Sequence, residues 1–175
     1  MLKEFAPVLP KDAICRPDDI EKSVRGFLIG DLTLAQLEGM TAPDLYSIAD
    51  IGYDYFEEGR YAIAGRIFRG LVKYNPFDPY FQAMTGASFQ RQGQPEQAVP
   101  HYMSVIELDP YNLHGWTNLG ESHIQVGIRY RKNGDQKAAA QSFEDGKRAL
   151  RRAIGLDTAG THPAALRARA ILALY

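Results

Sequence analysis

Histidine, cysteine and acidic side chains are the groups in this chain that could do acid–base, nucleophilic or metal chemistry, but their spacing favours none of it. No two histidines have the i, i+4 spacing that places metal ligands on one face of a helix; they are His101, His114, His123 and His162. Asp18–Asp19 and Glu57–Glu58 are adjacent pairs, so the members of each pair point to different faces of a helix. There is no Ser–His–Asp context and no glycine-rich loop between a strand and a helix. We therefore predict no enzyme, no metal site and no cofactor.

A period of 34 residues organises the middle of the chain. The residues that recur at this spacing are Gly52, Gly86 and Gly120; Gly59, Gly93 and Gly127; Ala64 and Ala98; Phe68 and Tyr102; Pro76 and Pro110. This pattern is the signature of tetratricopeptide repeats, in which two antiparallel helices cross closely at small residues. The sequence therefore predicts an all-α tetratricopeptide superhelix of three helical hairpins, with Gly52 facing Ala64 and Gly86 facing Ala98.

Capping signals and the period together predict the domain organisation. Residues 1–16 contain two prolines and no period, and are expected to form a flexible N-terminal arm. A single tetratricopeptide domain is expected over 17–175. Its parts are a helix near 17–29, a short helix over 33–39, repeats at 45–78, 79–112 and 113–160, and a capping helix at 161–175 with Thr161 as its N-cap.

The third repeat is longer than the other two. Its closing segment, Ala153–Asp157, arrives 14 residues late relative to Val105–Asp109. With a turn at Lys132–Asp135, each arm gains about two helical turns and keeps its packing face. We predict an extended hairpin, with helices over 113–132 and 135–156, that projects from the array. Its tip either contacts a partner or is only structural.

The first helix of each unit is expected to line the concave side of the superhelix. The predicted inner-face residues are Tyr46, Ala49, Tyr53, Phe56 and Glu57; Tyr80, Ala83, Ala87, Gln90 and Arg91; and His114, Thr117, Glu121, Ile124 and Gln125. Aromatic and small side chains beside polar ones suit an extended peptide, whose apolar side chains enter pockets while its backbone meets polar groups. The alternative is that the aromatic residues pack under the N-terminal helices.

An apolar stripe precedes the repeats. Ile20, Val24, Phe27 and Leu28 share one face of the first predicted helix. The stripe either mediates self-association, giving a homodimer, or caps the first repeat.

The charge of the chain is distributed unevenly. Residues 1–112 carry 10 basic and 16 acidic side chains, whereas residues 113–175 carry 10 basic and 5 acidic ones. Such polarity can orient a partner. Arginines cluster near the C-terminus, but no nucleic-acid-binding motif accompanies them, so no nucleic-acid partner is expected; they are Arg148, Arg151, Arg152, Arg167 and Arg169.

The expected location is the cytoplasm. The single cysteine, Cys15, rules out an intramolecular disulfide and fits a reducing compartment. No apolar run approaches the roughly 18 residues of a membrane span, and the N-terminus lacks the apolar core of a secretory signal. No direct membrane insertion is expected.

The segment Gly30–Met40, directly ahead of Leu45-x-x-Ile48-x-x-Ile51 and Glu58–Ala64, resembles the class II chaperones of bacterial type III secretion. The resemblance implies a chaperone for the hydrophobic translocators that form a pore in the host membrane. Such a chaperone grips an extended Pro/Val-x-Leu-x-x-Pro-like segment and keeps its cargo soluble and competent for secretion. A generic tetratricopeptide scaffold in another assembly, such as a needle-subunit co-chaperone, a pilus factor or an envelope factor, remains the alternative.

Overall fold

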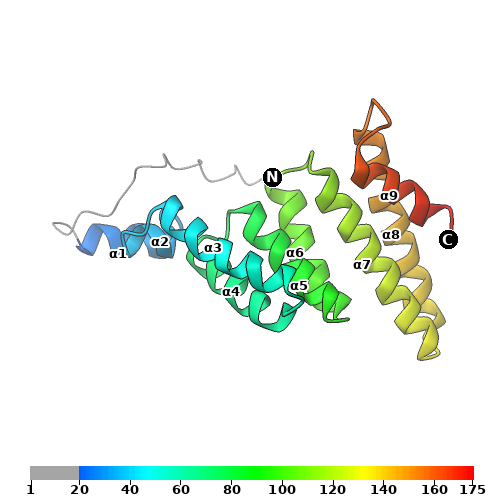
Figure 1. The fold of residues 1–175 in the computed structure, drawn as a ribbon, viewed down its shortest axis with the longest axis horizontal. Helices are drawn as coiled ribbons and strands as arrows, with labels where there is room; N and C mark the ends of the chain where they lie inside the picture. The colour runs from blue at the N-terminus through cyan, green and yellow to red at the C-terminus, as the bar shows by residue number, and fades with distance from the viewer. Residues whose placement is uncertain (1–19) are drawn as a thin grey trace.

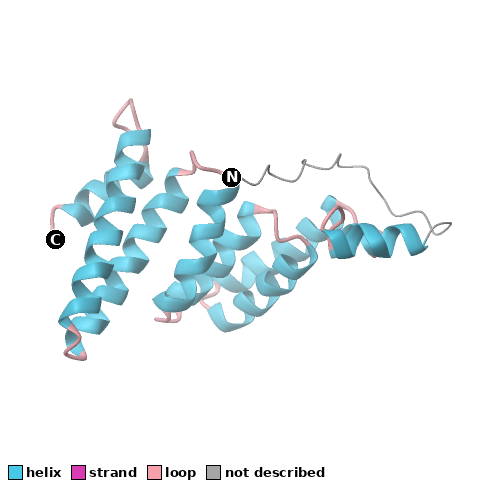
Figure 2. Cartoon of the chain, turned by 180° about the vertical axis from the view of Figure 1, so that it is seen from behind, coloured by secondary structure: helices cyan, strands magenta, loops and turns pink. Residues whose placement is uncertain are grey.

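The computed structural model describes residues 20–175, and every regular element in that range is a helix (Figures 1 and 2). The helices are α1 (Ile20–Ile29), α2 (Leu34–Leu37), α3 (Ala42–Glu57), α4 (Tyr61–Tyr74), α5 (Pro79–Arg91), α6 (Pro95–Leu108), α7 (Leu113–Lys132), α8 (Gln136–Leu156) and α9 (Pro163–Leu172). The predicted all-α tetratricopeptide fold is confirmed. The arm predicted for residues 1–16 lies outside the described residues, as do the first residues of the predicted N-terminal helix.

Three antiparallel hairpins, α3–α4, α5–α6 and α7–α8, stack side by side in chain order (Figure 1). Each hairpin packs on the next through its second helix, so α4 contacts α5 and α6 contacts α7. Helices α3, α5, α7 and α9 form one layer, because rings of α3 and α5 touch and α7 packs on both α5 and α9. One face of this layer is therefore built from the first helix of every hairpin.

Each helix of this layer has a side chain that caps its N-terminus. Thr41 and Asp44 form a reciprocal capping box at the start of α3, and the Asp78 carboxylate accepts the backbone N–H of Tyr80 at 2.9 Å at the start of α5. The Asn112 side chain accepts the N–H of Gly115 at 2.8 Å at the start of α7. The prediction that Thr161 caps α9 is wrong, because His162 holds that position and its Nδ1 accepts the N–H of Ala164 at 3.2 Å.

The recurring glycines mark where the two helices of a hairpin approach each other. A Cβ placed on Gly52 or on Gly86 would lie 3.0 Å from the ring of Phe68 or Tyr102, respectively. The nearest neighbours are thus these aromatic rings, joined at Gly52 by the Ile67 side chain, also at 3.0 Å, rather than the alanines that the period suggested. In the third hairpin the crossing is between two glycines, since a Cβ on Gly120 would lie 3.0 Å from the carbonyl oxygen of Gly146.

The second helices of the hairpins, α4, α6 and α8, form the other layer, and the core runs along the stack between the two layers. Phe68 of the first hairpin and Phe81 of the second are fully buried in one cluster, and Tyr102 of the second hairpin and Leu150 of the third are fully buried farther along the stack. Ala168 of α9 is buried against this last part of the core, so α9 closes the end of the array.

The extended hairpin is present as predicted from its length. Helices α7 and α8 have 20 and 21 residues, and Gly134, with a φ of +86°, makes the turn between them. The hairpin is attached to the rest of the array, because the Arg129 guanidinium donates to Glu96 at 2.7 Å and to the carbonyl of Gly93 at 2.6 Å. On the other side, the ring of Phe143 stacks on Tyr175 with centroids 5.7 Å apart. Side chains at 128–137 nevertheless remain exposed.

Within residues 20–175, no helix combines the length and the apolar character needed to cross a membrane.

Candidate peptide-binding face

One face of α3 alternates tyrosines with carboxylates. Tyr46, Asp50, Tyr53 and Glu57 follow one another at intervals of four, three and four residues, which places them on the same side of the helix. Tyr46 and Tyr53 are each 43% exposed. The ring of Tyr46 stacks on that of Tyr80 in α5, with centroids 6.0 Å apart, and its hydroxyl donates to Asp78 at 2.9 Å. The predicted inner-face tyrosines of the first two repeats therefore lie together.

All three of these phenols are neutral at physiological pH. Burial, followed by the neighbouring Asp78 carboxylate, raises the pKa of Tyr46 to about 12. Burial raises the pKa of Tyr80, and the nearby Tyr53 and Asp50 add to this effect. The adjacent carboxylate of Glu57 raises the pKa of Tyr53. The three hydroxyls thus serve as hydrogen-bond donors and add no negative charge of their own.

The next helix of this layer, α5, contributes small and polar residues. Ala83 and Ala87 are half-buried and present only methyl groups. The Gln90 side chain accepts a hydrogen bond from the buried hydroxyl of Tyr102 at 3.0 Å. The Arg91 guanidinium lies over the rings of Tyr61 and Phe56, 5.6 and 6.0 Å from their centroids. Arg91 is exposed and its charge is available to a ligand.

The far end of the face joins α7 to α9. The Arg167 guanidinium of α9 lies 3.8 Å from Glu121 and donates to Asn118, both in α7. The rings of His114 and His162 meet edge to face with centroids 5.1 Å apart, and burial together with His162 and Arg167 lowers the pKa of His114. Sequence reasoning missed His162 and Arg167 because the helix they belong to or cap, α9, lies outside the repeat period, which therefore could not place its side chains. It missed Asn118 because that position of α7 is not among the inner-face positions of the repeat.

Three residues predicted for the inner face belong to the core. Ala49 and Thr117 are fully buried and Ile124 is almost so. The Thr117 hydroxyl donates to the carbonyls of Leu113 and Ala164, at 2.8 and 3.1 Å, and Ile124 packs in a cluster that includes residues of α8 and α9. The prediction that these residues line a groove is wrong, because neighbouring helices cover that side of α3 and α7.

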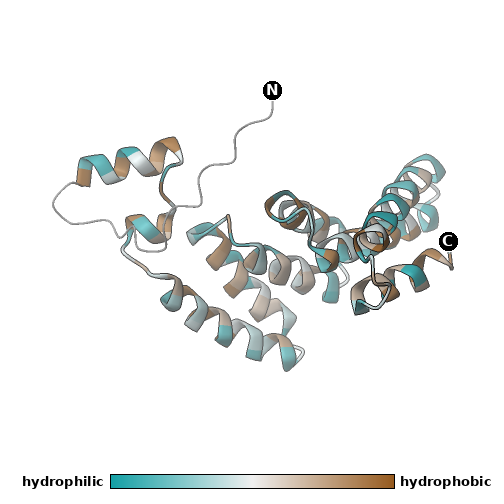
Figure 3. Cartoon of the chain, turned by 90° about the horizontal axis from the view of Figure 1, so that it is seen from above, coloured by the Kyte–Doolittle hydropathy of each residue, from teal (hydrophilic) through white to brown (hydrophobic). Residues whose placement is uncertain are grey.

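The apolar stripe of α1 is uncovered. Ile20 is 69% exposed and Leu28 is 74% exposed, and Val24 and Phe27 are also exposed. Helix α1 packs on α2 and stands apart from the hairpins, with hydrophobic segments along it (Figure 3). The stripe therefore does not cap the first repeat in this structure. Self-association through it stays a prediction.

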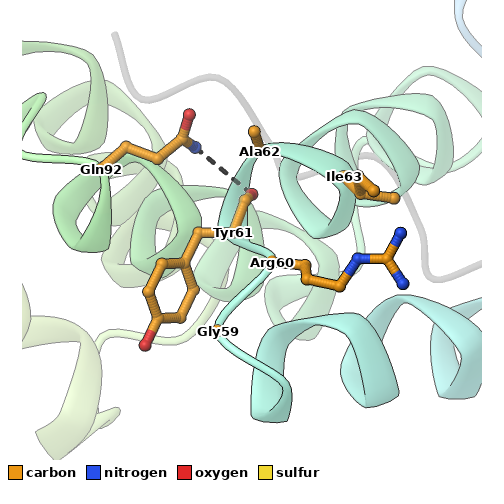
Figure 4. A pocket seen from close by; sticks show the side chains of 6 residues that line it. All are labelled: Gly59, Arg60, Tyr61, Ala62, Ile63 and Gln92. Atoms are coloured by element: carbon orange, nitrogen blue, oxygen red, sulfur yellow. Dashed lines mark hydrogen bonds between the residues drawn. The ribbon is translucent and has the colours of Figure 1, made fainter.

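A shallow pocket lies at the C-terminal end of α3, on the turn between α3 and α4. It is lined by Gly59, Arg60, Tyr61, Ala62, Ile63 and Gln92 (Figure 4). The Gln92 amide donates to the carbonyl of Tyr61 at 3.3 Å, while the Tyr61 ring and the Arg60 guanidinium point in opposite directions (Figure 4). No nucleophile–base pair lines this pocket. In the described part of the chain, no cluster of His, Cys, Asp or Glu could hold a metal ion.

Solved structures with the same arrangement of helices include proteins of type III secretion. The translocator chaperone SycD of Yersinia enterocolitica superposes with a TM-score of 0.65 at 18% identity, over 82% of this chain and 98% of SycD. A type III secretion complex from Aeromonas hydrophila gives a TM-score of 0.70 at 21% identity, over 87% of this chain and 94% of the matched one. PcrH, bound to the chaperone-binding region of PopD, gives 0.61 at 22% identity, over 78% and 93%. This chain shares its fold with SycD and PcrH.

These likenesses cover most of both chains. At 18–22% identity they establish the fold and leave the ligand to be argued from the chain's own residues. No protein-family model matches the sequence.

Proposed function

We propose that this protein is a cytoplasmic chaperone that binds an extended segment of a hydrophobic type III secretion translocator across the face formed by α3, α5 and α7. The observation that carries the proposal is the pair of exposed rings on α3, Tyr46 and Tyr53, beside the half-buried ring of Tyr80 on α5. Exposed aromatic side chains that sit together on a rigid helical scaffold are typical of protein-binding surfaces.

The proposed site residues are taken from the inner-face residues that remain accessible. They are Tyr46, Tyr53, Phe56, Tyr80, Ala83, Ala87, Gln90, Arg91 and Glu121. Rings and methyl groups would receive apolar side chains of the cargo, while Gln90, Arg91 and Glu121 offer hydrogen bonds to its backbone. Nothing in this set activates a nucleophile, so binding is the whole of the proposed activity.

Binding of this kind suits a cargo that must stay unfolded. Membrane-seeking segments aggregate in water, and a chaperone that holds one short extended stretch keeps the chain soluble without letting it fold. The affinity per unit area is modest because ordering the cargo costs conformational entropy, and this also permits release. SycD is described as a translocator chaperone and PcrH is bound to a segment of PopD, which supports the same role here.

Co-expression with translocators from the same genome tests the proposal. We expect the chaperone to raise the soluble fraction of the translocator and to co-purify with it. Tyr53→Ala should weaken this capture, whereas Tyr111→Ala should leave it unchanged, since Tyr111 is 73% exposed but lies on the α6–α7 turn. Overlapping peptides of the translocator then locate the bound segment. Absence of capture by the wild-type chain, or equal loss in both variants, would exclude the proposal.

The alternative is a tetratricopeptide scaffold in another assembly, such as a needle-subunit co-chaperone or a pilus or envelope factor. The same co-purification separates the two, because a scaffold of that kind would capture a needle or envelope subunit and leave the translocator insoluble.

A further inference from the structure

Negative charge accompanies the exposed rings of α3. We call the group formed by Tyr46, Asp50, Tyr53, Glu57 and Tyr80 the aromatic–acidic surface. Across from it, α5 presents only methyl groups at Ala83 and Ala87, roughly one and two turns after Tyr80. A purely apolar peptide would gain contacts with the rings but would leave the Asp50 carboxylate without a charged partner, whereas Glu57 already interacts with Tyr53.

The carboxylates of this surface have no cation within the described part of the chain. Neither Asp50 nor Glu57 is in an ion pair with any residue between 20 and 175. Two arginines contact other rings of α3 or its turn: Arg60 pairs with Glu58 at 3.3 Å and lies over Tyr55, and Arg91 lies over Phe56 and Tyr61. Asp50 is therefore an exposed charge between two tyrosines, free to pair with a ligand.

The orientation of the rings limits what the surface can hold. The hydroxyl of Tyr46 is committed to Asp78, and its ring is nearly parallel to that of Tyr80, at an interplanar angle of 13°. The exposed part of Tyr46 therefore presents ring surface rather than a free hydroxyl. The faces of aromatic rings attract cations, and long basic side chains lay their methylene stems along apolar surface while the charged head stays in water.

We propose that the aromatic–acidic surface binds a lysine or arginine side chain of the extended partner segment. The methylene stem lies against the rings of Tyr46 and Tyr53, over the methyl groups of α5, and the cationic head pairs with Asp50. The inference rests on the proposed function, and it adds the chemistry of one cargo position: a basic residue among the apolar ones. It also sets the register of the cargo, because the basic residue must lie at the α3 end of the face.

A guest series of peptides tests the inference without the natural cargo. Fluorescein-labelled peptides of about 14 residues share a Gly/Ser frame with fixed Val and Leu residues, and differ at one guest position that carries lysine, norleucine or glutamate. Norleucine keeps the stem and removes only the charge. By fluorescence anisotropy we expect lysine to bind about three- to tenfold more tightly than norleucine, and glutamate to bind most weakly. The preference should shrink on raising the salt from about 0.05 to 0.5 M.

The second part of the test reverses the charge of Asp50 on the protein. Asp50→Lys should invert the order, so that the glutamate peptide binds most tightly, and Asp50→Asn should abolish the difference between lysine and norleucine. Glu107→Lys is the matched control, since it makes the same change of charge at an exposed position of α6, in the other layer. Circular dichroism of each variant checks that the helices are intact.

A wild-type protein without lysine preference in this series, whether or not the peptides bind, overturns the inference. So does a preference that survives Asp50→Lys or that disappears equally in Glu107→Lys. The proposed chaperone function is decided separately by co-purification of the unmodified translocator. Capture of that cargo combined with no lysine preference would thus reject the basic cargo residue and retain the chaperone.

Discussion

Tyr53 and Phe56 lie three residues apart on α3 but differ in how far solvent reaches their rings. Tyr53 is 43% exposed, whereas Phe56 is half-buried and meets the ring of Tyr61 edge to face, with centroids 5.1 Å apart. We therefore expect Tyr53 to contribute mainly to cargo binding and Phe56 mainly to the stability of the fold, although both were predicted for the same inner face.

The first prediction follows from this difference. Tyr53→Ala should weaken cargo binding by about 1–2 kcal/mol and change the free energy of unfolding by less than about 0.5 kcal/mol. Phe56→Ala should lower the free energy of unfolding by about 1–3 kcal/mol, because it removes a ring that packs against the core. Urea denaturation and peptide anisotropy measure the two quantities. Loss of most of the helicity in Tyr53→Ala would show that this ring is core.

His123 is a second residue whose surroundings have a measurable consequence. It stands one repeat after Phe89, at a half-buried position, and burial lowers its pKa below 6.5, with a smaller opposing effect of Asp145. The folded state thus favours neutral histidine. Stability is therefore highest above the unfolded-state pKa near 6.5 and is lost progressively as the pH falls from that value through the lower folded-state pKa. The pKa values of His101 and His114 are lowered in the same direction, also mainly by burial.

The second prediction is that the urea midpoint falls between about pH 7.5 and pH 5, and falls less in His123→Phe than in the wild type. Phenylalanine is the matched replacement, since Phe89 occupies the equivalent place in the second repeat. The difference between the two chains isolates the histidine from the carboxylates that titrate at lower pH. Parallel pH dependences in the two proteins would contradict the assignment.

At the scale of the element, the two helices of the third hairpin cross so closely that the contact point has room for glycine but not for a larger residue. A Cβ on Gly120 would lie 2.7 Å from Cγ of Leu150 and 3.0 Å from the carbonyl oxygen of Gly146, and a backbone oxygen cannot yield as the end of a flexible side chain can. Gly155, in the last turns of α8, has nothing within 4 Å of the same position.

The third prediction compares these two glycines. Gly120→Ala should destabilise the protein by about 1–3 kcal/mol through overpacking. Gly155→Ala should stabilise it by about 0.5–1 kcal/mol, because alanine favours the helix and meets no neighbour. Thermal or urea unfolding measures both. A neutral Gly120→Ala would mean that α7 and α8 can move apart without cost.

At the scale of the whole molecule, the helices at the two ends of the stack differ in whether their apolar faces are buried. Helix α9 buries Ala164, Ala165 and Ala168 against the last hairpin, whereas α1 leaves its apolar stripe in solvent. An uncovered stripe of this size, next to an array that closes its own core, is suited to pairing with a second copy.

The fourth prediction is that removal of residues 1–30 abolishes self-association and leaves the repeats folded. The capping boxes of α2 and α3, at Thr33 and Thr41, stay in the shortened chain and keep those helices able to start. Sedimentation velocity measures the mass distribution, and circular dichroism measures the helicity. Ile20→Ser with Leu28→Ser in the full chain is the control for loss of other contacts. A folded truncated chain with an unchanged mass distribution would exclude α1 as the interface.

Much of the fold was predictable because it depends on local rules. The period located the hairpins, and Thr33, Thr41 and Pro163 marked helix starts within a residue or two of where the structure has them. The late arrival of Ala153–Asp157 predicted the length of the third hairpin, since inserting about two helical turns in each arm keeps the same side of each helix toward its neighbour.

The accessible part of the candidate site was less predictable. A repeat register assigns the same face to Tyr53 and to Ala49, but only the packing of neighbouring helices determines that one is exposed and the other buried. In the same way, Thr117 and Ile124 were placed on the inner face by the register and are covered in the structure, where α9 lies against α7.

The sequence by itself determined which elements form and in what order, because helix capping, hydrophobic spacing and the 34-residue period act between residues close together in the chain. Tertiary structure alone decided which side chains share a surface. The stack of Tyr46 on Tyr80, the contact of Arg167 with Glu121 and the uncovered stripe of α1 depend on how separate helices meet. Those meetings depend on side-chain shape and burial across distant segments, which no local pattern encodes.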